Sequence, residues 1–151
     1  MAWGFKYKIK LHLTHPTMDP DVISKQLADI EPSHTAKAGE PVQRESGRVR
    51  VPSLSVWQAR LHEEAWLHTE NDDSENNDFS NVLRTCLEKL APHSELFKDI
   101  QQEGWAYLRV VHFSDTTHCV NIIKADVLQQ CASLGLDLDL EFYAPDRPEV
   151  L

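Results

Sequence analysis

The chain has 151 residues, of which 41% are hydrophobic and 26% are charged, and 24 acidic side chains against 15 lysines and arginines give a formal charge of −9. This length and composition exclude a disordered chain and predict one folded domain over residues 1–151. The negative charge disfavours nucleic acids and acidic membranes as partners, and it favours a basic protein.

No apolar run in the sequence is long enough to span a membrane, and the start of the chain alternates in polarity, unlike a signal peptide. We therefore expect no membrane contact and a cytoplasmic location. The three cysteines, which lack a CxxC pair, fit free thiols in a reducing compartment; they are Cys86, Cys119 and Cys131.

The first predicted elements are a strand and a helix. Residues 5–13 alternate strictly between apolar and polar side chains, which predicts a strand with one buried face. A helix follows, with Asp19 as its N-cap and Pro20 in its first turn, and Pro32 ends it. The polar face of the strand carries Lys6, Lys8, Lys10 and His12.

The middle of the chain is largely polar. Between Ser33 and Pro52, the segment RVRVP is typical of a short edge strand. Residues 55–62 alternate again and predict a second full strand. The acidic stretch at about 68–78 holds no large apolar side chain, which predicts a mobile connection.

The second half of the chain predicts three helices and three strands. Residues 79–90 carry an apolar stripe at helical spacing, and Pro92 stops that helix. The other elements are a short helix from Ser94 to Gly104, a hairpin of residues 105–113 and 118–123 around the turn SDTT, a helix over 124–134 ended by Gly135, and a final alternating strand LDLDLEFY.

This order predicts an α+β fold, in which an antiparallel or mixed sheet is covered on one face by helices, as in a ferredoxin-like sandwich. The polar face of the last strand carries Asp137, Asp139 and Glu141. If the first strand were its neighbour, lysines would face these carboxylates, and each pair would contribute roughly 0.2 to 1 kcal/mol. A ferredoxin-like order gives that neighbourhood, so we expect the first and last strands to be adjacent.

Motifs for catalysis or metal binding are missing from the sequence. The eight histidines form no HExxH or HxH pattern, so no metal or other cofactor is expected, and there is no GxGxxG, GxxxxGK[ST] or GxSxG motif. In a hairpin with a two-residue loop, His112 and Cys119 would face each other as a thiol–imidazole pair. The alternative that we favour is a strand histidine beside a small buried thiol, because a change of one residue in loop length removes the pair. No catalytic residue is predicted.

The loop HTAKAGEPV, residues 34–42, is a candidate ligand-binding element. Together with Trp57 and Arg60 on the next strand, its Lys37, Gly39 and Glu40 could line a pocket for an anionic or zwitterionic small molecule. The alternative, which we favour, is that Gly39 supplies the positive φ angle of a turn while Lys37 and Glu40 are solvated.

Three parts of the chain resemble a bacterial family catalogued as domain of unknown function 4279. LADIEP and KAGE resemble its helix end and its Lys-x-Gly-Glu loop, and Trp57 resembles the tryptophan that opens a later strand. LQQCASLGLDLDLEFY resembles its final helix, Leu-Gly-Leu, acidic strand and tyrosine. The resemblance spans about Tyr7 to Tyr143, and it implies a fold but no known activity or catalytic residues.

These features favour a small cytoplasmic, non-enzymatic module that binds another protein. A specific form of this hypothesis is an immunity or antitoxin-like protein that neutralises a basic toxin. The first alternative is a ligand-binding or catalytic pocket at the 34–42 loop and the strand of Trp57. The second is a structural homodimer subunit that pairs through a sheet edge, so both a monomer and a homodimer are open.

Overall fold

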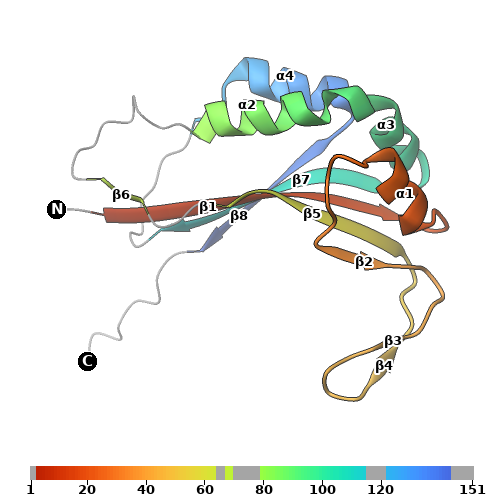
Figure 1. Ribbon diagram of the computed structural model, residues 1–151. Coiled ribbons are helices and arrows are strands. Elements are labelled where there is room, and N and C mark those ends of the chain that lie inside the picture. Colours follow the sequence, from red (N-terminus) through yellow and green to blue (C-terminus); the bar gives the residue numbers. More distant parts are fainter. Residues whose placement is uncertain (1–2, 64–66, 70–78, 115–121, 144–151) are drawn as a thin grey trace, which may run out of the picture.

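A computed structural model gives the fold and describes residues 3–63, 67–69, 79–114 and 122–143. A long, twisted sheet carries the helices on one side only (Figure 1). In chain order the elements are β1 (Trp3–His15), α1 (Pro20–Gln26), β2 (His34–Ala36), β3 (Val42–Gln43), β4 (Val49–Arg50), β5 (Ser55–Glu63), β6 (Leu67–Thr69), α2 (Phe79–Leu90), the 3-10 turn η2 (Ala91–His93), α3 (Ser94–Glu103), β7 (Trp105–Ser114), α4 (Ala125–Leu134) and β8 (Asp137–Tyr143).

The strands of the main sheet follow the order β2-β5-β1-β7-β8, and β6 pairs with the beginning of β1. Strands β7 and β8 are parallel, while β1 is antiparallel to both β5 and β7. The sheet is therefore mixed, and the predicted α+β class with helices on one face is confirmed. β3 and β4 form a separate two-stranded sheet, so RVRVP does not join the edge of the main sheet.

The predicted adjacency of the first and last strands is wrong, because β7 lies between β1 and β8. The carboxylates of β8 face Arg109 of β7 instead of the lysines of β1. The ferredoxin-like arrangement, which rested on that adjacency, is not confirmed.

The predicted hairpin after β7 is also wrong. Both edges of β7 are occupied, since residues 105–114 pair with β1 and residues 107–113 pair with β8. The proposed pairing of His112 with Cys119 cannot be followed, because Cys119 lies outside the described residues. The acidic connection is outside them from residue 70 to residue 78, while His68 and Thr69 belong to β6.

The alternation in β1 produces the core as predicted. Its apolar residues from Tyr7 to Leu13 are at most 2% exposed and face the helices. In β5, Trp57 and Ala59 are buried beside them, but a β-bulge inserts Leu61, so that His62 takes the core side and stacks on Tyr7 at 5.4 Å between ring centres.

The helices begin and end close to the predicted signals. In α1 the Asp19 side chain accepts a hydrogen bond from the Asp21 amide at 2.9 Å, but the helix ends at Gln26, well before Pro32. At the end of α4, Gly135 adopts φ 75°, the left-handed conformation that a glycine after a helix adopts without strain. None of the helices in the described parts of the chain is both long and apolar enough to cross a membrane.

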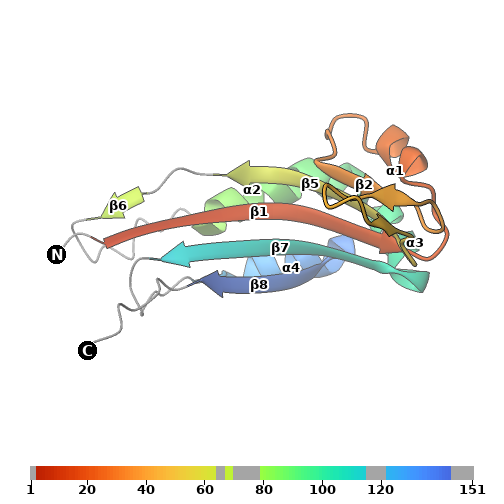
Figure 2. The same ribbon diagram turned by 90° about the horizontal axis from the view of Figure 1, so that it is seen from below.

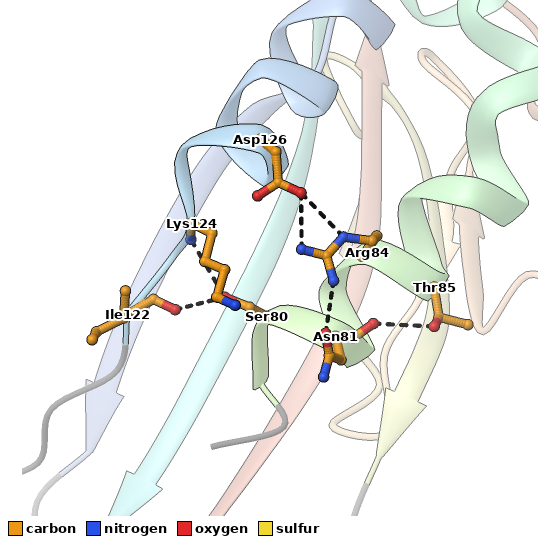
Figure 3. A network of polar contacts seen from close by, with 7 residues as sticks. All are labelled: Ser80, Asn81, Arg84, Thr85, Ile122, Lys124 and Asp126. Atoms are coloured by element: carbon orange, nitrogen blue, oxygen red, sulfur yellow. Dashed lines mark hydrogen bonds and ion pairs between the residues drawn. The ribbon is translucent and has the colours of Figure 1, made fainter. Parts of the chain in front are cut away.

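A polar clamp joins α2 to the start of α4 and closes the helix layer (Figure 3). Arg84 donates to Asp126 at 2.9 Å and to Asn81 at 2.7 Å. Ser80 donates to the Ile122 carbonyl at 2.6 Å, and its oxygen accepts from the Lys124 amide at 3.4 Å. These contacts are internal to the helix layer, so the clamp has a structural role.

Candidate functional site

Within the candidate ligand-binding loop, residues 34–42, Lys37 and Glu40 contact the domain itself. Lys37 Nζ lies 3.2 Å from Asp19 Oδ2 at the N-cap of α1 and 3.5 Å from Glu40 Oε1. The Glu40 amide donates to the Lys37 carbonyl at 3.1 Å, and Gly39 between them has φ 79°. A glycine with positive φ at the third position of such a turn is typical of type II. The loop thus fastens the chain to α1.

The structure does not bring the five predicted residues to one place. Trp57 is fully buried on the helix side of the sheet, where its indole Nε1 donates to Ser24 Oγ at 2.9 Å. Arg60 is exposed, and its side chain lies 3.5 Å from that of Glu63. Its register partner on β1 is Lys10, so Arg60 lies on the face of the sheet that is turned away from the helices. A ligand-binding role for these residues stays a prediction.

Replacement of Gly39 by alanine tests the turn. We expect the free energy of unfolding to fall by about 1 kcal/mol, because alanine is strained at this φ angle while no atom lies within 4 Å of its added Cβ. The measurement is urea unfolding. Gly39→Asn is the matched control and should cost less, since asparagine tolerates the left-handed region. Equal stability of wild type and Gly39→Ala would contradict this turn.

Figure 2 shows the sheet face turned away from the helices, which we call the open face. Polar side chains form a hydrogen-bonded network on it. Its side chains alternate with those of the core along β1, β7 and β8. The residues of the open face used below are Lys6, Lys8, Lys10, His12, Trp105, Tyr107, Arg109, Asp137, Asp139 and Glu141.

His12 and Tyr107 form the buried centre of the open face. Although no helix covers them, they are only 5% and 6% exposed. Their rings stack with centres 5.0 Å apart, and the Tyr107 hydroxyl lies 3.4 Å from His12 Nδ1. Arg109 Nη2 donates to the same hydroxyl at 3.3 Å. In the neutral tautomer with an unprotonated Nδ1, His12 can accept a hydrogen bond from the Tyr107 hydroxyl.

The surroundings of His12 oppose its protonation. Burial, followed by the positive charges of Arg109 and Lys10, lowers the pKa of His12 to about 4. Its Nε2 atom is buried and has no hydrogen-bond partner in the described part of the chain. Burial also raises the pKa of Tyr107, so both rings are uncharged at neutral pH.

The edge of the open face carries more negative than positive charge. Arg109 Nε lies 2.8 Å from Asp139 and 3.3 Å from Glu141, and each of these side chains is about one third exposed. Asp137 accepts a hydrogen bond from the Trp105 indole at 2.8 Å, and it forms no ion pair with any residue that the structure describes. Trp105 is 48% exposed, and its ring lies 4.5 Å from that of Tyr107. The edge therefore offers a fixed aromatic ring beside excess carboxylates.

The family model of a domain of unknown function, DUF4279, matches residues 5–145, which is nearly the whole chain. The chain belongs to this family. The resemblance inferred from KAGE, Trp57 and the final strand is thereby confirmed. No curated protein and no solved structure shows significant similarity to the chain.

A small cavity in the DUF4279 domain lies between the helix layer and β7 and β8. Its volume is about 40 Å³, and its lining consists of Phe79, Val110, His112, Ile123, Leu140 and Phe142. Pockets for metabolites are several hundred Å³, so this space is large enough for little more than a water molecule. Burial lowers the pKa of His112, which favours its neutral form.

The two described cysteines of the DUF4279 domain are poor nucleophiles. Burial raises the pKa of Cys86 to about 11 and also raises that of Cys131, so neither thiol ionises readily at neutral pH. Cys86 is one of the buried residues of α2, and Cys131 is one of those of α4. Across residues 3–63, 67–69, 79–114 and 122–143, no group of three or more histidine, cysteine or acidic side chains is arranged to hold a metal ion.

Sequence reasoning missed the open face of the DUF4279 domain as a site, although one signal was present. Strand β7 reads WAYLRVVHF, an almost continuous apolar run interrupted by Arg109. Such a run is typical of a central strand with both faces covered, and a lone arginine within it indicates acidic neighbours. The stacking of His12 on Tyr107 depends on strand register, for which the sequence holds no comparable signal.

Proposed function

We propose that the domain is a non-enzymatic protein-binding module and that its open face at β7 and β8 holds a basic partner. The observation that carries this proposal is the preformed edge of the open face. There Trp105 is held half-exposed by Asp137 and Tyr107, beside carboxylates that outnumber the single Arg109. A rigid aromatic ring next to fixed charges is typical of a protein interface anchor.

Charge supports a basic partner in two ways. The whole chain carries −9, which steers positively charged proteins toward it. At close range, Asp137 and the carboxylates around Arg109 would accept hydrogen bonds from lysine or arginine side chains of the partner. An immunity or antitoxin-like role against a basic toxin is the specific form of this proposal, and it rests on analogy with acidic proteins of that class.

The state of the nucleophilic and basic groups favours binding over catalysis. A general base works best with a pKa near the working pH, whereas the pKa of His12 is lowered to about 4. The raised pKa values of Cys86 and Cys131 disfavour thiolate chemistry.

Affinity capture from the native cell extract tests the proposal. The tagged wild-type chain should retain a basic protein that elutes as salt is raised, because its contacts are charged and exposed. A variant with Trp105→Ala, Asp137→Asn and Glu141→Gln should lose that partner by about tenfold or more. The matched control carries Glu88→Gln and Glu95→Gln on the helix layer and should retain it. Recovery of no partner, or equal recovery by both variants, would contradict the proposal.

A further inference from the structure

The segment from Val42 to Val51, which we call the arginine hairpin, projects from the main sheet on the side away from the helices (Figure 1). Its turn is closed by the Arg44 amide, which donates to the Arg48 carbonyl at 2.9 Å, and by the Gly47 amide, which donates to the Arg44 carbonyl at 2.9 Å. Gly47 has φ 77°. These are the features of a three-residue hairpin loop with a glycine bulge, so the two arms have a defined register.

That register places three arginines on one face of the hairpin. Val42 pairs with Arg50, and Gln43 pairs with Val49. Side chains alternate along each arm, so Arg44 lies on the same side as Val42, and Arg48 lies on the same side as Arg50. The opposite side carries Val49 and Val51, which are 64% and 58% exposed.

These three arginines differ from the other described arginines. Arg60, Arg84 and Arg109 each lie within 3.5 Å of a carboxylate. By contrast, Arg44, Arg48 and Arg50 are exposed and form no ion pair with any residue that the structure describes. Three guanidinium groups on one face repel one another, and a set of carboxylates from outside would relieve that repulsion.

The complementary surface is present on the same chain, on strand β8. Asp137, Asp139 and Glu141 point to the open face at alternate positions, and Arg109 lies within 3.3 Å of the last two. Alternate residues on a strand are about 7 Å apart both in β8 and in the arms of the hairpin. Charge and spacing thus match between the two elements.

Within one molecule, the three hairpin arginines form no ion pair with β8 in the described part of the chain. The arginine hairpin connects β2 to β5, while β8 is at the other end of the strand order. A second copy of the chain would bring the same carboxylates to the hairpin.

We propose that the domain self-associates as a two-fold dimer, in which the arginine hairpin of each protomer docks on β8 of the other. A two-fold arrangement makes the same contact twice and closes the assembly, whereas a single contact in one direction would extend into filaments. Because β8 also belongs to the proposed binding surface, a basic partner and a second copy would compete for it.

Sedimentation velocity of the full chain tests this dimer. The wild type should be a dimer at about 0.05 M salt and should dissociate at about 0.5 M salt, because the contact is made by exposed charges. Replacing all three hairpin arginines (Arg44→Glu, Arg48→Glu, Arg50→Glu) should raise the dissociation constant by about tenfold or more. A control with Lys25→Glu, Lys89→Glu and Lys98→Glu changes the net charge equally on other elements and should remain dimeric.

A charge-swap experiment identifies the docking partner of the hairpin. A second variant carries Asp137→Lys and Glu141→Lys, and it keeps Asp139 for Arg109. Alone it should be monomeric, but mixed with the hairpin variant it should form a heterodimer in which both contacts again join opposite charges. Circular dichroism checks that each variant is folded. A wild type that is monomeric at low salt, hairpin variants that associate like wild type, or a mixture of two folded variants that stays monomeric would overturn the proposal.

Discussion

Replacing Trp57 with alanine is expected to lower the free energy of unfolding by about 3 to 5 kcal/mol. Trp57 is fully buried among core residues of β1 and β5, and its indole donates to Ser24 of α1 at 2.9 Å. The substitution removes the largest fully buried side chain among the described residues and leaves the Ser24 hydroxyl without this partner. Small domains are stable by about 5 to 15 kcal/mol, so the variant should be close to unfolding.

Chemical unfolding followed by circular dichroism measures this effect. Trp57→Phe keeps an aromatic ring but loses the hydrogen bond, and it should cost about 1 to 3 kcal/mol. The double variant with Ser24→Ala separates the hydrogen bond from the packing, because both polar partners are then removed. If Trp57→Ala cost less than about 1 kcal/mol, the indole would not be a core residue, and a ligand-binding role for Trp57 would be favoured again.

Acidification is expected to destabilise the domain through His12. The pKa of His12 is about 4 in the folded protein and 6.5 in a model compound, so the unfolded chain binds the proton more tightly. The contribution is present in full above pH 6.5 and is lost as the pH falls toward 4. Each pKa unit corresponds to about 1.4 kcal/mol, so the loss is about 2 kcal/mol at pH 5 and about 3 kcal/mol at pH 4.

The variant His12→Phe isolates this effect, because phenylalanine can stack on Tyr107 but cannot bind a proton. Its free energy of unfolding, measured by urea titration at a series of pH values, should fall less steeply than that of wild type below pH 6.5. A residual slope is expected from His112, whose pKa is also lowered. Identical slopes for His12→Phe and wild type would contradict the burial of His12.

Features that depend on local sequence were predictable. The alternation from Tyr7 to Leu13, the apolar stripe of α2 and the glycine at the end of α4 each follow from one segment and its period. The predicted bounds were accordingly close to the observed ones for six elements: β1, β5, α2, α3, α4 and β8. In each of these segments the local residue pattern favours one type of secondary structure, and tertiary packing does not override it.

Strand pairing was not predictable from the same information. The carboxylates of β8 could be balanced by the lysines of β1 or by Arg109 of β7, and charge alone does not select one neighbour. The bulge at Leu61 could not be predicted from the sequence either. It moves His62 to the other side of the sheet, but the alternation of residues before it is the same as in a regular strand. The open face depends on this pairing, since it joins His12 of β1 to Tyr107 and Arg109 of β7.

Carboxyl footprinting of the captured complex tests most directly the claim that the open face is the binding surface. A carbodiimide and glycine ester label exposed carboxylates, and mass spectrometry compares the free domain with the complex. We expect that labelling of Asp137, Asp139 and Glu141 falls in the complex while labelling of Glu88, Glu95 and Asp99 on the helices is unchanged. Protection of the helix carboxylates with unchanged labelling of β8 would contradict it.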